Sequence, residues 1–359
     1  MNPRDRFRAR LMFSAVLTKQ IYQLITKIET IRAQWQAGVK LSPQTISQLQ
    51  TSVIVTSTGA SNRIEGNKLT DVEIKTLYQK RNITNLKTRD EQEVAGYLEV
   101  IQQIFESWEG MSLSENMVLY LHKELLKYSE KDARHRGSYK FTSNRVEARD
   151  ETGKVVGVIF DPTPQFLVPK EMQELVEWTI EELKVDEFPP LLVIASFIFE
   201  FLAIHPFQDG NGRTSRVLTN LMLLQHGYDF ARVASHEQII EENKADYYAA
   251  LNQTQQTWKT DDEDLCPWVL FFLRVVLLQG ERSLKLAEKQ SNNLEWELSV
   301  KQQTVWDWIQ LQSKEFTKTM VIEGTGINIR TVEETIKKLI KIGKVQRLGQ
   351  GRGVRYRNI

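Results

Sequence analysis

Apolar residues recur every three or four positions along most of the chain. The spacing is clear in residues 11–31, 93–108 and 171–183, and it is the period of one face of an α-helix. A continuous apolar stretch at 191–204 is too short to span a membrane and contains Glu200, which favours a buried helix. The pattern therefore predicts a mainly α-helical protein.

One interval breaks the helical period. Between Arg136 and Pro164, short runs rich in β-branched residues lie around a turn signal at Asp150 to Gly153, and the interval ends in proline-rich coil. Such runs on either side of a turn are typical of paired strands. We therefore expect a small β-hairpin inserted between helices, which resume at Pro169.

Residues 300–359 predict a separate C-terminal unit. Thr331, with Glu334 three residues later, has the pattern of a capping box and predicts the start of a helix that Gly343 ends. A shorter helical segment precedes this helix, and residues 345–357 predict two strands about a glycine-rich turn. The order of helix, turn, helix and basic hairpin resembles a winged helix-turn-helix.

Charge is divided unevenly along the chain. The whole chain has a net charge of +1, but from Lys301 onward 12 basic residues stand against 5 acidic ones, which gives +7 and leaves −6 for the first 300 residues. A basic unit attached to an acidic body favours a polyanionic partner such as DNA, although the basic surface of a protein-docking module fits as well. The residues expected to meet phosphates are Arg330, Lys337, Lys341, Arg347, Arg352 and Arg355.

Cysteine usage and the first residues bear on the cellular compartment. The single cysteine, Cys266, excludes an internal disulfide and any site of several thiolates, and a lone thiol is typical of a reducing compartment. The start, MNPRDRFRARLMF, lacks the uninterrupted apolar segment of a secretory signal. We therefore expect a cytoplasmic protein without a membrane role.

The apolar stretch runs directly into a polar cluster, HPFQDGNGRTSR, at residues 205–216. Gly210, Asn211 and Gly212 predict a turn that opens the next helix, and the free N–H groups of such a turn suit phosphate oxygens. Arg213 and Arg216 are three positions apart and would project from the same side of the first helical turn. Together they would grip a polyphosphate.

Two further residues of the cluster could carry chemistry. Asp209 offers the hard oxygen ligand that Mg²⁺ takes when phosphates and water complete its shell. His205, when neutral, could accept a proton from an incoming hydroxyl near pH 7, and Phe207 is expected to anchor the loop in the core. Taken singly, each residue also fits a structural role, as a helix cap or a surface charge. The ordered combination predicts phosphoryl or nucleotidyl transfer, and the signatures of P-loop enzymes, zinc proteases and α/β-hydrolases do not occur.

HPFQDGNGRTSR resembles the signature of the Fic family, HPFx[DE]GNGRxxR, at every fixed position. The resemblance implies a helical Fic domain that transfers AMP from ATP to a Ser, Thr or Tyr hydroxyl of a protein and releases pyrophosphate. It implies that His205 is the base, that Asp209 holds Mg²⁺ and that the glycine turn binds phosphates. Arg213 and Arg216 would then take the β and γ phosphates, and Thr214 would join the ATP-binding residues.

The resemblance extends beyond this motif. The expected hairpin stands in the place of the family's flap, which pairs with an extended target segment by strand addition. Lys140 stands where arginine is more often expected. The segment that contains Tyr247, Tyr248 and Leu251 resembles the family's segment near adenine, although aromatic residues at this spacing are also typical of a core. Some members of the family transfer UMP, phosphate or phosphocholine, and the unaltered motif favours ATP.

A second motif, at residues 56–70, indicates control. Ser61, Glu65 and Gly66 resemble the family's inhibitory motif, [ST]xxxE[GN]. Gly66 predicts a helix end that places Glu65 in the last turn, where the helix dipole disfavours an anion and a cationic partner is needed. The resemblance implies that Glu65 pairs with Arg216 and blocks the productive position of the γ-phosphate. A surface glutamate near a helix end is the alternative interpretation.

These patterns predict three regions: an N-terminal helical region at 1–110, a Fic-like core at 111–290 and a winged helix-turn-helix at 300–359. The expected function is that of a Mg²⁺-dependent, self-restrained protein adenylyltransferase that acts on another protein or on itself. Two alternatives stay open: a DNA-binding regulator whose core senses nucleotide, and an enzyme that removes AMP while Glu65 orients a water. The oligomeric state is open, with a homodimer among the options.

Overall fold

The computed structural model describes residues 3–38, 43–79, 86–144, 146–149, 155–291, 298–312, 315–349 and 353–358. The chain divides into two compact units, one formed by Met1–Gly38 with Gln50–Leu284 and the other by Val39–Leu49 with Lys285–Ile359. Each unit has its own cluster of buried apolar side chains. The expected N-terminal region and Fic-like core lie in the first unit except for residues 39–49 and 285–290, and the boundary at residue 110 stays a prediction.

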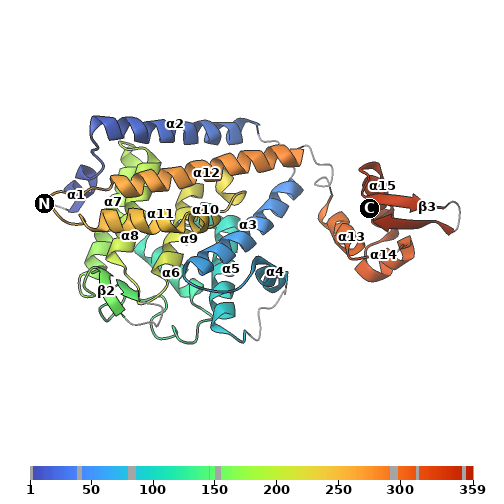
Figure 1. The fold of residues 1–359 in the computed structure, drawn as a ribbon, viewed down its shortest axis with the longest axis horizontal. Helices are drawn as coiled ribbons and strands as arrows, with labels where there is room; N and C mark the ends of the chain where they lie inside the picture. The colour runs from blue at the N-terminus through green and yellow to red at the C-terminus, as the bar shows by residue number, and fades with distance from the viewer. Residues whose placement is uncertain are drawn as a thin grey trace. The chain divides into compact units, whose positions relative to one another are not determined.

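Helices dominate the first unit, which confirms the mainly α-helical prediction (Figure 1). Two single-turn helices, η1 (Trp108–Gly110) and η2 (Asp229–Arg232), accompany the α-helices. The α-helices up to residue 291 are α1 (Pro3–Ala9), α2 (Ala15–Gly38), α3 (Pro43–Ile64), α4 (Asp71–Gln79), α5 (Arg89–Ser107), α6 (Glu115–Leu125), α7 (Val168–Val185), α8 (Pro190–Ile204), α9 (Asn211–Gln225), α10 (His236–Glu242), α11 (Lys244–Gln255) and α12 (Cys266–Ser291). The start of α3, to Leu49, and the end of α12, from Lys285, are assigned to the second unit.

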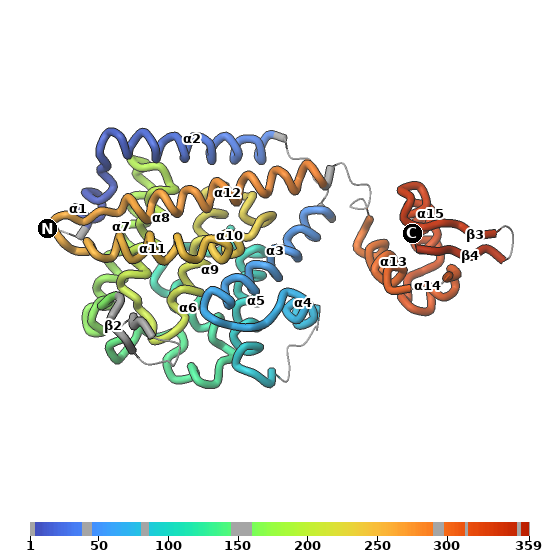
Figure 2. The backbone as a smooth tube through the Cα atoms, in the orientation of Figure 1, coloured from blue at the N-terminus to red at the C-terminus, as the bar shows by residue number. Residues whose placement is uncertain are grey.

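Helix α8 lies at the centre of this unit. All its residues from Leu191 to Ile204 are buried, and it packs against α7 on one side and α9 on another, as the traces in Figure 2 show. A helix that is apolar on every face has to be covered on every face, which explains its place. Glu200, its one charged residue, is paired with Arg6 and Arg10. Among the described residues, no helix has both the length and the apolar composition of a membrane span.

The interval after α6 contains the expected hairpin. Strands β1 (Val146–Arg149) and β2 (Val155–Phe160) pair antiparallel, with Val146 opposite Phe160 and Arg149 opposite Val155. Two register irregularities interrupt the pairing. The turn predicted at Asp150 to Gly153 lies outside the described residues.

The second unit contains α13 (Val300–Gln310), α14 (Lys318–Thr325) and α15 (Ile329–Lys341), followed by the antiparallel strands β3 (Val345–Leu348) and β4 (Arg355–Asn358). Its core is small and includes Trp306, Phe316, Val332, Ile336, Leu339 and Tyr356. The order of elements matches the one expected from the sequence, and the winged helix-turn-helix stays a resemblance. Arg352, one of the six basic residues named above, lies outside the described residues.

The predicted N-cap of α15 is wrong by three residues. Asn328, not Thr331, caps the helix, because its side chain accepts a hydrogen bond from the Thr331 N–H at 3.0 Å. Asparagine is as good a cap as threonine, so the earlier residue takes the role. Glu334 pairs instead with Arg330, one turn earlier. The predicted end is confirmed: Gly343 has a φ of 73° directly after the helix.

Candidate active site

His205 lies at the point where α8 stops. Its φ of 51° places it in the left-handed region, and its N–H still donates to Phe201 O at 3.0 Å. Nδ1 lies 3.3 Å from Leu202 O. Because a carbonyl oxygen only accepts, Nδ1 carries the proton and Nε2 keeps its lone pair. Burial, with a smaller contribution from Lys140, lowers the pKa of His205 to about 4, so the imidazole is neutral at pH 7.

The loop after His205 is closed by Phe207 and Asn211. Phe207 is fully buried, as expected for an anchor, and stacks on His122 with ring centroids 3.7 Å apart. The Phe207 N–H donates to Asn211 Oδ1 at 2.9 Å, and Asn211 Nδ2 donates to Phe207 O at 2.8 Å. The Asn211 side chain is therefore used by the loop itself, which leaves the Asn211 N–H as its group for a phosphate.

Helix α9 begins with the glycine turn. Gly210 is the cap, with a φ of 81°, and the Thr214 N–H is the donor that reaches Gly210 O, at 2.9 Å. The N–H groups of Asn211, Gly212 and Arg213 precede the first intrahelical bond and have no acceptor within the helix. Such groups, at the positive end of the helix dipole, suit an anion. The Thr214 hydroxyl, buried beside them, has no hydrogen-bond partner among the described residues.

Asp209 precedes this turn and is fixed from both sides. Its carbonyl oxygen lies 3.0 Å from His122 Nε2, and its carboxylate accepts from the Gly210 N–H at 2.6 Å and from Arg213 Nη2 at 3.2 Å. Burial opposes ionisation, but Arg213 and the Gly210 N–H outweigh it and hold the pKa of Asp209 below its ordinary value. The side chain is 33% exposed, so the charged carboxylate faces outward.

Arg213 is almost fully buried and incompletely satisfied. Besides Asp209, its guanidinium meets Glu93 of α5, with Nη1 3.6 Å from Glu93 Oε2. Neither Nε nor Nη1 has a hydrogen-bond partner among the described residues. Arg89 pairs with the same two carboxylates: its Nε lies 2.7 Å from Glu93 Oε1, and its Nη2 lies 3.3 Å from Asp209 Oδ2. The cluster holds two arginines and two acids around donors that remain free.

Arg216 contacts the end of α3. Its Nε donates to Ser61 Oγ at 2.7 Å, and Nη2 donates to Ser61 O at 2.9 Å and to Glu65 Oε1 at 2.8 Å. The structure therefore contains the pairing of Glu65 with Arg216 that the sequence predicts. The helix ends at Ile64, so Glu65 follows the last helical residue rather than lying in the last turn. Gly66, with a φ of 93°, completes the helix end as expected.

The Glu65 and Arg216 charges stabilise each other. Burial opposes the ionisation of Glu65, but the attraction of Arg216 outweighs it and holds the pKa of the carboxyl below its ordinary value. The pKa of Arg216 is correspondingly raised, against the cost of its own burial. The Glu65 carboxylate also lies against Gly212, where a Cβ atom would collide with it. Glu65 thus occupies space at the glycine turn itself.

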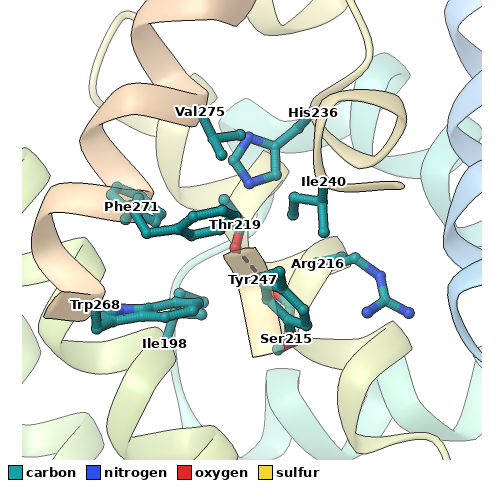
Figure 3. Close-up of a pocket in the computed structure, with 11 residues that line it drawn as sticks. Ile198, Ser215, Arg216, Thr219, His236, Ile240, Tyr247, Trp268, Phe271 and Val275 are labelled. Atoms are coloured by element: carbon teal, nitrogen blue, oxygen red, sulfur yellow. Dashed lines mark hydrogen bonds between the residues drawn. The ribbon is translucent and has the colours of Figure 1, made fainter. Parts of the chain in front are cut away.

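The residues expected near adenine lie on α11 and divide into two environments. Tyr247 is 3% exposed, and Leu251 is also buried, whereas Tyr248 is 44% exposed. Figure 3 shows Tyr247 beside Arg216 and Ser215, at a small pocket whose aromatic wall includes Trp268. Tyr247 therefore belongs to the core, as the alternative interpretation of these aromatics held, while Tyr248 presents a ring to the surface.

Several polar residues of the site escape sequence analysis. His122 of α6 accepts from the Gly137 N–H at its Nδ1, and burial lowers its pKa to about 4, so its Nε2–H donates to Asp209 O. Glu237 of α10 is fully buried and accepts from Tyr97 and Asn220 behind Arg216. In the sequence, these residues are marked only as polar side chains on an otherwise apolar helix face. This signal does not identify the residue that each of them contacts.

A metal ion would need ligands from its substrate. The described residues contain no group of three or more His, Cys, Asp or Glu side chains that could hold a metal. Asp209 provides a charged, partly exposed carboxylate directly before the phosphate-binding turn. This donor set fits Mg²⁺, which typically takes one or two carboxylates and completes its shell with phosphates and water.

Comparison with known proteins agrees with this geometry. The model of the Fic/DOC family matches residues 112–223. A protein of Aquifex aeolicus named "Probable protein adenylyltransferase" is 34% identical over 104 residues, which are 28% of this chain and 28% of that protein. A Nematostella vectensis protein named "Protein adenylyltransferase Fic" is 24% identical over 219 residues, 60% of this chain and 45% of that protein. The chain thus spans less than half the length of these curated relatives.

The fold is also shared. A crystal structure of a Fic family protein from Desulfovibrio desulfuricans G20 matches with a TM-score of 0.67 at 21% identity and covers 97% of each chain. At this identity, the likeness shows the fold alone. The polar cluster from His205 to Arg216 lies within the matched residues 112–223. This chain therefore contains a region, residues 112–223, that is similar to the Fic/DOC family.

Proposed function

We propose that this protein transfers AMP from ATP to a Ser, Thr or Tyr hydroxyl of a target protein, which can be a second copy of itself, and releases pyrophosphate. The names of the two relatives, both called protein adenylyltransferases, support this reaction. The observation that carries it is the buried Arg213, in the same motif as the neutral His205: the Arg213 nitrogens Nε and Nη1 lack hydrogen-bond partners in the described structure. A buried cation with free donors favours an anion such as a triphosphate.

The reaction assigns each group one task. The acceptor oxygen forms a bond to the α-phosphorus, the bond from that phosphorus to the bridging oxygen of pyrophosphate breaks, and the hydroxyl proton passes to His205 Nε2. The N–H groups of the glycine turn and the guanidinium of Arg213 hold phosphate oxygens in place. Asp209 would hold Mg²⁺, which supplies neutralisation of the polyphosphate charge when bound.

Glu65 restrains this reaction. In the described state, Arg216 Nε and Nη2 donate to Ser61 and Glu65, and the Glu65 carboxylate already neutralises the charge that a γ-phosphate would need. The carboxylate also adds a negative charge against Gly212, where phosphate oxygens would lie. A triphosphate that binds in this state is therefore repelled by the Glu65 carboxylate at the place where Arg216 would otherwise attract it. We infer that removal of Glu65 releases the enzyme.

The Glu65→Gly variant tests the proposal. Incubated with ATP labelled at the α-phosphate and Mg²⁺, it should incorporate at least about tenfold more label into protein than the parent chain, since a tenfold change corresponds to about 1.4 kcal/mol of lost restraint. Adding His205→Ala to the same variant should abolish incorporation. Glu109→Gly, a change at an exposed glutamate of the same unit, provides the matched control and should behave as the parent.

Each part of the proposal has its own contrary result. Equal incorporation by the parent and Glu65→Gly chains would remove the restraint, and undiminished incorporation with His205→Ala would remove His205 as the base. Label from the γ-phosphate appearing on protein would replace AMP transfer by phosphate transfer. Release of AMP from a previously modified target by the parent chain would assign Glu65 to the orientation of a water.

A further inference from the structure

Residues 140–144, here called the flap base, lie between α6 and the hairpin and contact the loop that carries His205. The contacts involve both backbone and side chains of the flap base. Three hydrogen bonds make the connection: the Lys140 N–H to Pro206 O at 2.8 Å, Thr142 Oγ1 to Gln208 Oε1 at 2.8 Å, and Asn144 Nδ2 to Phe207 O at 2.7 Å. The flap base therefore fixes three successive residues after His205.

The Lys140 side chain extends this contact to the residue before His205. Its Nζ donates to Ile204 O at 3.2 Å and to Asn144 Oδ1 at 2.7 Å. Lysine is seldom fully buried, yet Lys140 is only 4% exposed. Burial lowers the pKa of Lys140 to about 8, with Asp161 and Glu171 opposing the shift, so the ammonium is mostly protonated at pH 7. Its position suits a cation, because Ile204 ends α8 at the negative end of the helix dipole.

His205 needs such support for its backbone. A non-glycine residue in the left-handed region costs about 1–2 kcal/mol, and His205 has a φ of 51°. A conformation of this kind persists only where surrounding contacts hold it. Lys140 and Asn144 hold the carbonyl oxygens on either side of His205, at Ile204, Pro206 and Phe207.

We propose that Lys140, acting with Asn144, is a positioning residue for His205: it fixes the loop so that Nε2 faces the acceptor hydroxyl. The inference deepens the proposed AMP transfer and rests on it. Strand β1 begins at Val146, two residues after the flap base. The same contacts therefore connect the hairpin to His205, the proposed general base. A target strand paired with the hairpin is thereby held in register with His205.

Kinetics of the released enzyme provide the first test. In the Glu65→Gly background, Lys140→Met keeps the apolar stem but removes the donor to Ile204 O. We expect kcat for AMP transfer to fall by up to about 100-fold, the typical cost of a reacting group displaced by about 1 Å, while KM for ATP stays unchanged. Lys140→Arg should restore most of kcat because it keeps the charge and the donors. Lys170→Met, at a lysine side chain that is 72% exposed, is the matched control.

An activity-independent measurement accompanies the kinetics. The charged groups that act on the imidazole of His205 are Lys140, which lowers its pKa, and Glu65 and Asp209, which raise it. In an NMR titration of the chain without nucleotide, the His205 pKa should rise in Lys140→Met and remain low in Lys140→Arg. This readout also decides the inference if Glu65→Gly proves inactive and the proposed reaction fails.

Unchanged kcat together with an unchanged His205 titration in Lys140→Met would overturn the inference. If Lys140→Met does not fold, Asn144→Ala replaces it, since that change removes the donor to Phe207 O but leaves the lysine in place. A normal kcat in Asn144→Ala would then count against the positioning role, and a lowered kcat with an unchanged KM for ATP would support it.

Discussion

Among the described residues, the first unit contains buried ion pairs besides exposed ones, whereas the ion pairs of the second unit lie at its surface. The side chains of Arg10 and Glu200 are each 1% exposed, whereas Lys318 and Glu333 are 38% and 49% exposed. A buried charge has lost its water and depends on its partner, while an exposed charge keeps its water whether or not the partner is present. Pairs of oppositely charged residues therefore affect folding stability strongly where they are buried, in the first unit. They affect it little where they are exposed, as in the second unit.

The largest contrast is expected at Glu200. Its carboxylate is shared by Arg6 and Arg10 and accepts from the Trp258 indole at 3.1 Å. In Glu200→Gln, two arginines keep only Glu263 as a buried acidic partner, so we expect the free energy of unfolding to fall by about 3–5 kcal/mol. Urea unfolding of the full chain, followed by circular dichroism, measures this loss. A loss in the free energy of unfolding below about 1 kcal/mol would show that this buried ion pair matters no more than an exposed one.

A smaller effect is expected from acid. His122 and His205 have pKa values of about 4 in the folded chain, below the ordinary value of 6.5. Between these limits the unfolded chain binds protons that the folded chain does not, so stability falls as the pH drops from 6.5 towards 4. For the fully buried His122 this amounts to about 2 kcal/mol between pH 7 and 5.

Thermal unfolding of the first unit at pH 7 and pH 5 checks this prediction. The melting temperature of the parent chain should fall over this range, where most carboxylates remain ionised. His122→Gln, which cannot titrate, should lose less than the parent. Equal losses in the two chains would assign the acid sensitivity to other groups.

The smallest effect is expected in the second unit. Glu333→Gln removes the ion pair with Lys318, whose Nζ lies 2.7 Å from Glu333 Oε1. Because both side chains are well exposed, we expect a change within about 0.5 kcal/mol. Hydrogen exchange of the amides of α15 reports this unit separately from the first. A loss comparable to that of Glu200→Gln would erase the contrast between the units.

The sequence predicts the fold and the centre of the site through two kinds of signal. Helical periodicity and the interrupted stretch before Pro164 yield the helices and the hairpin, because burial of one face constrains residue type. The segment from His205 to Arg216 is continuous, so its chemistry is visible without a structure. Glu65 could be paired with Arg216 from the sequence because both belong to motifs that the family resemblance names.

Other parts of the site are set by tertiary packing and carry no local signal. Glu93 and His122 reach the glycine turn from α5 and α6, and nothing in their own helices identifies Arg213 or Asp209 as the partner. Lys140 is noticeable only as a lysine where arginine is expected. The misplaced start of α15 has a simpler cause: Asn328 and Thr331 are both competent caps, and the apolar pattern alone does not choose between them.

The absence of a side chain at Gly212 matters both for inhibition by Glu65 and for the binding of phosphate. A second α-hydrogen in place of a side chain gives the Glu65 carboxylate room to approach, and it also allows a phosphate to come close to the backbone. A side chain at position 212 that evicted the carboxylate would also crowd the nucleotide. Mutations that relieve the inhibition by Glu65 and keep the activity should therefore occur at the end of α3. The glycine turn itself should tolerate none.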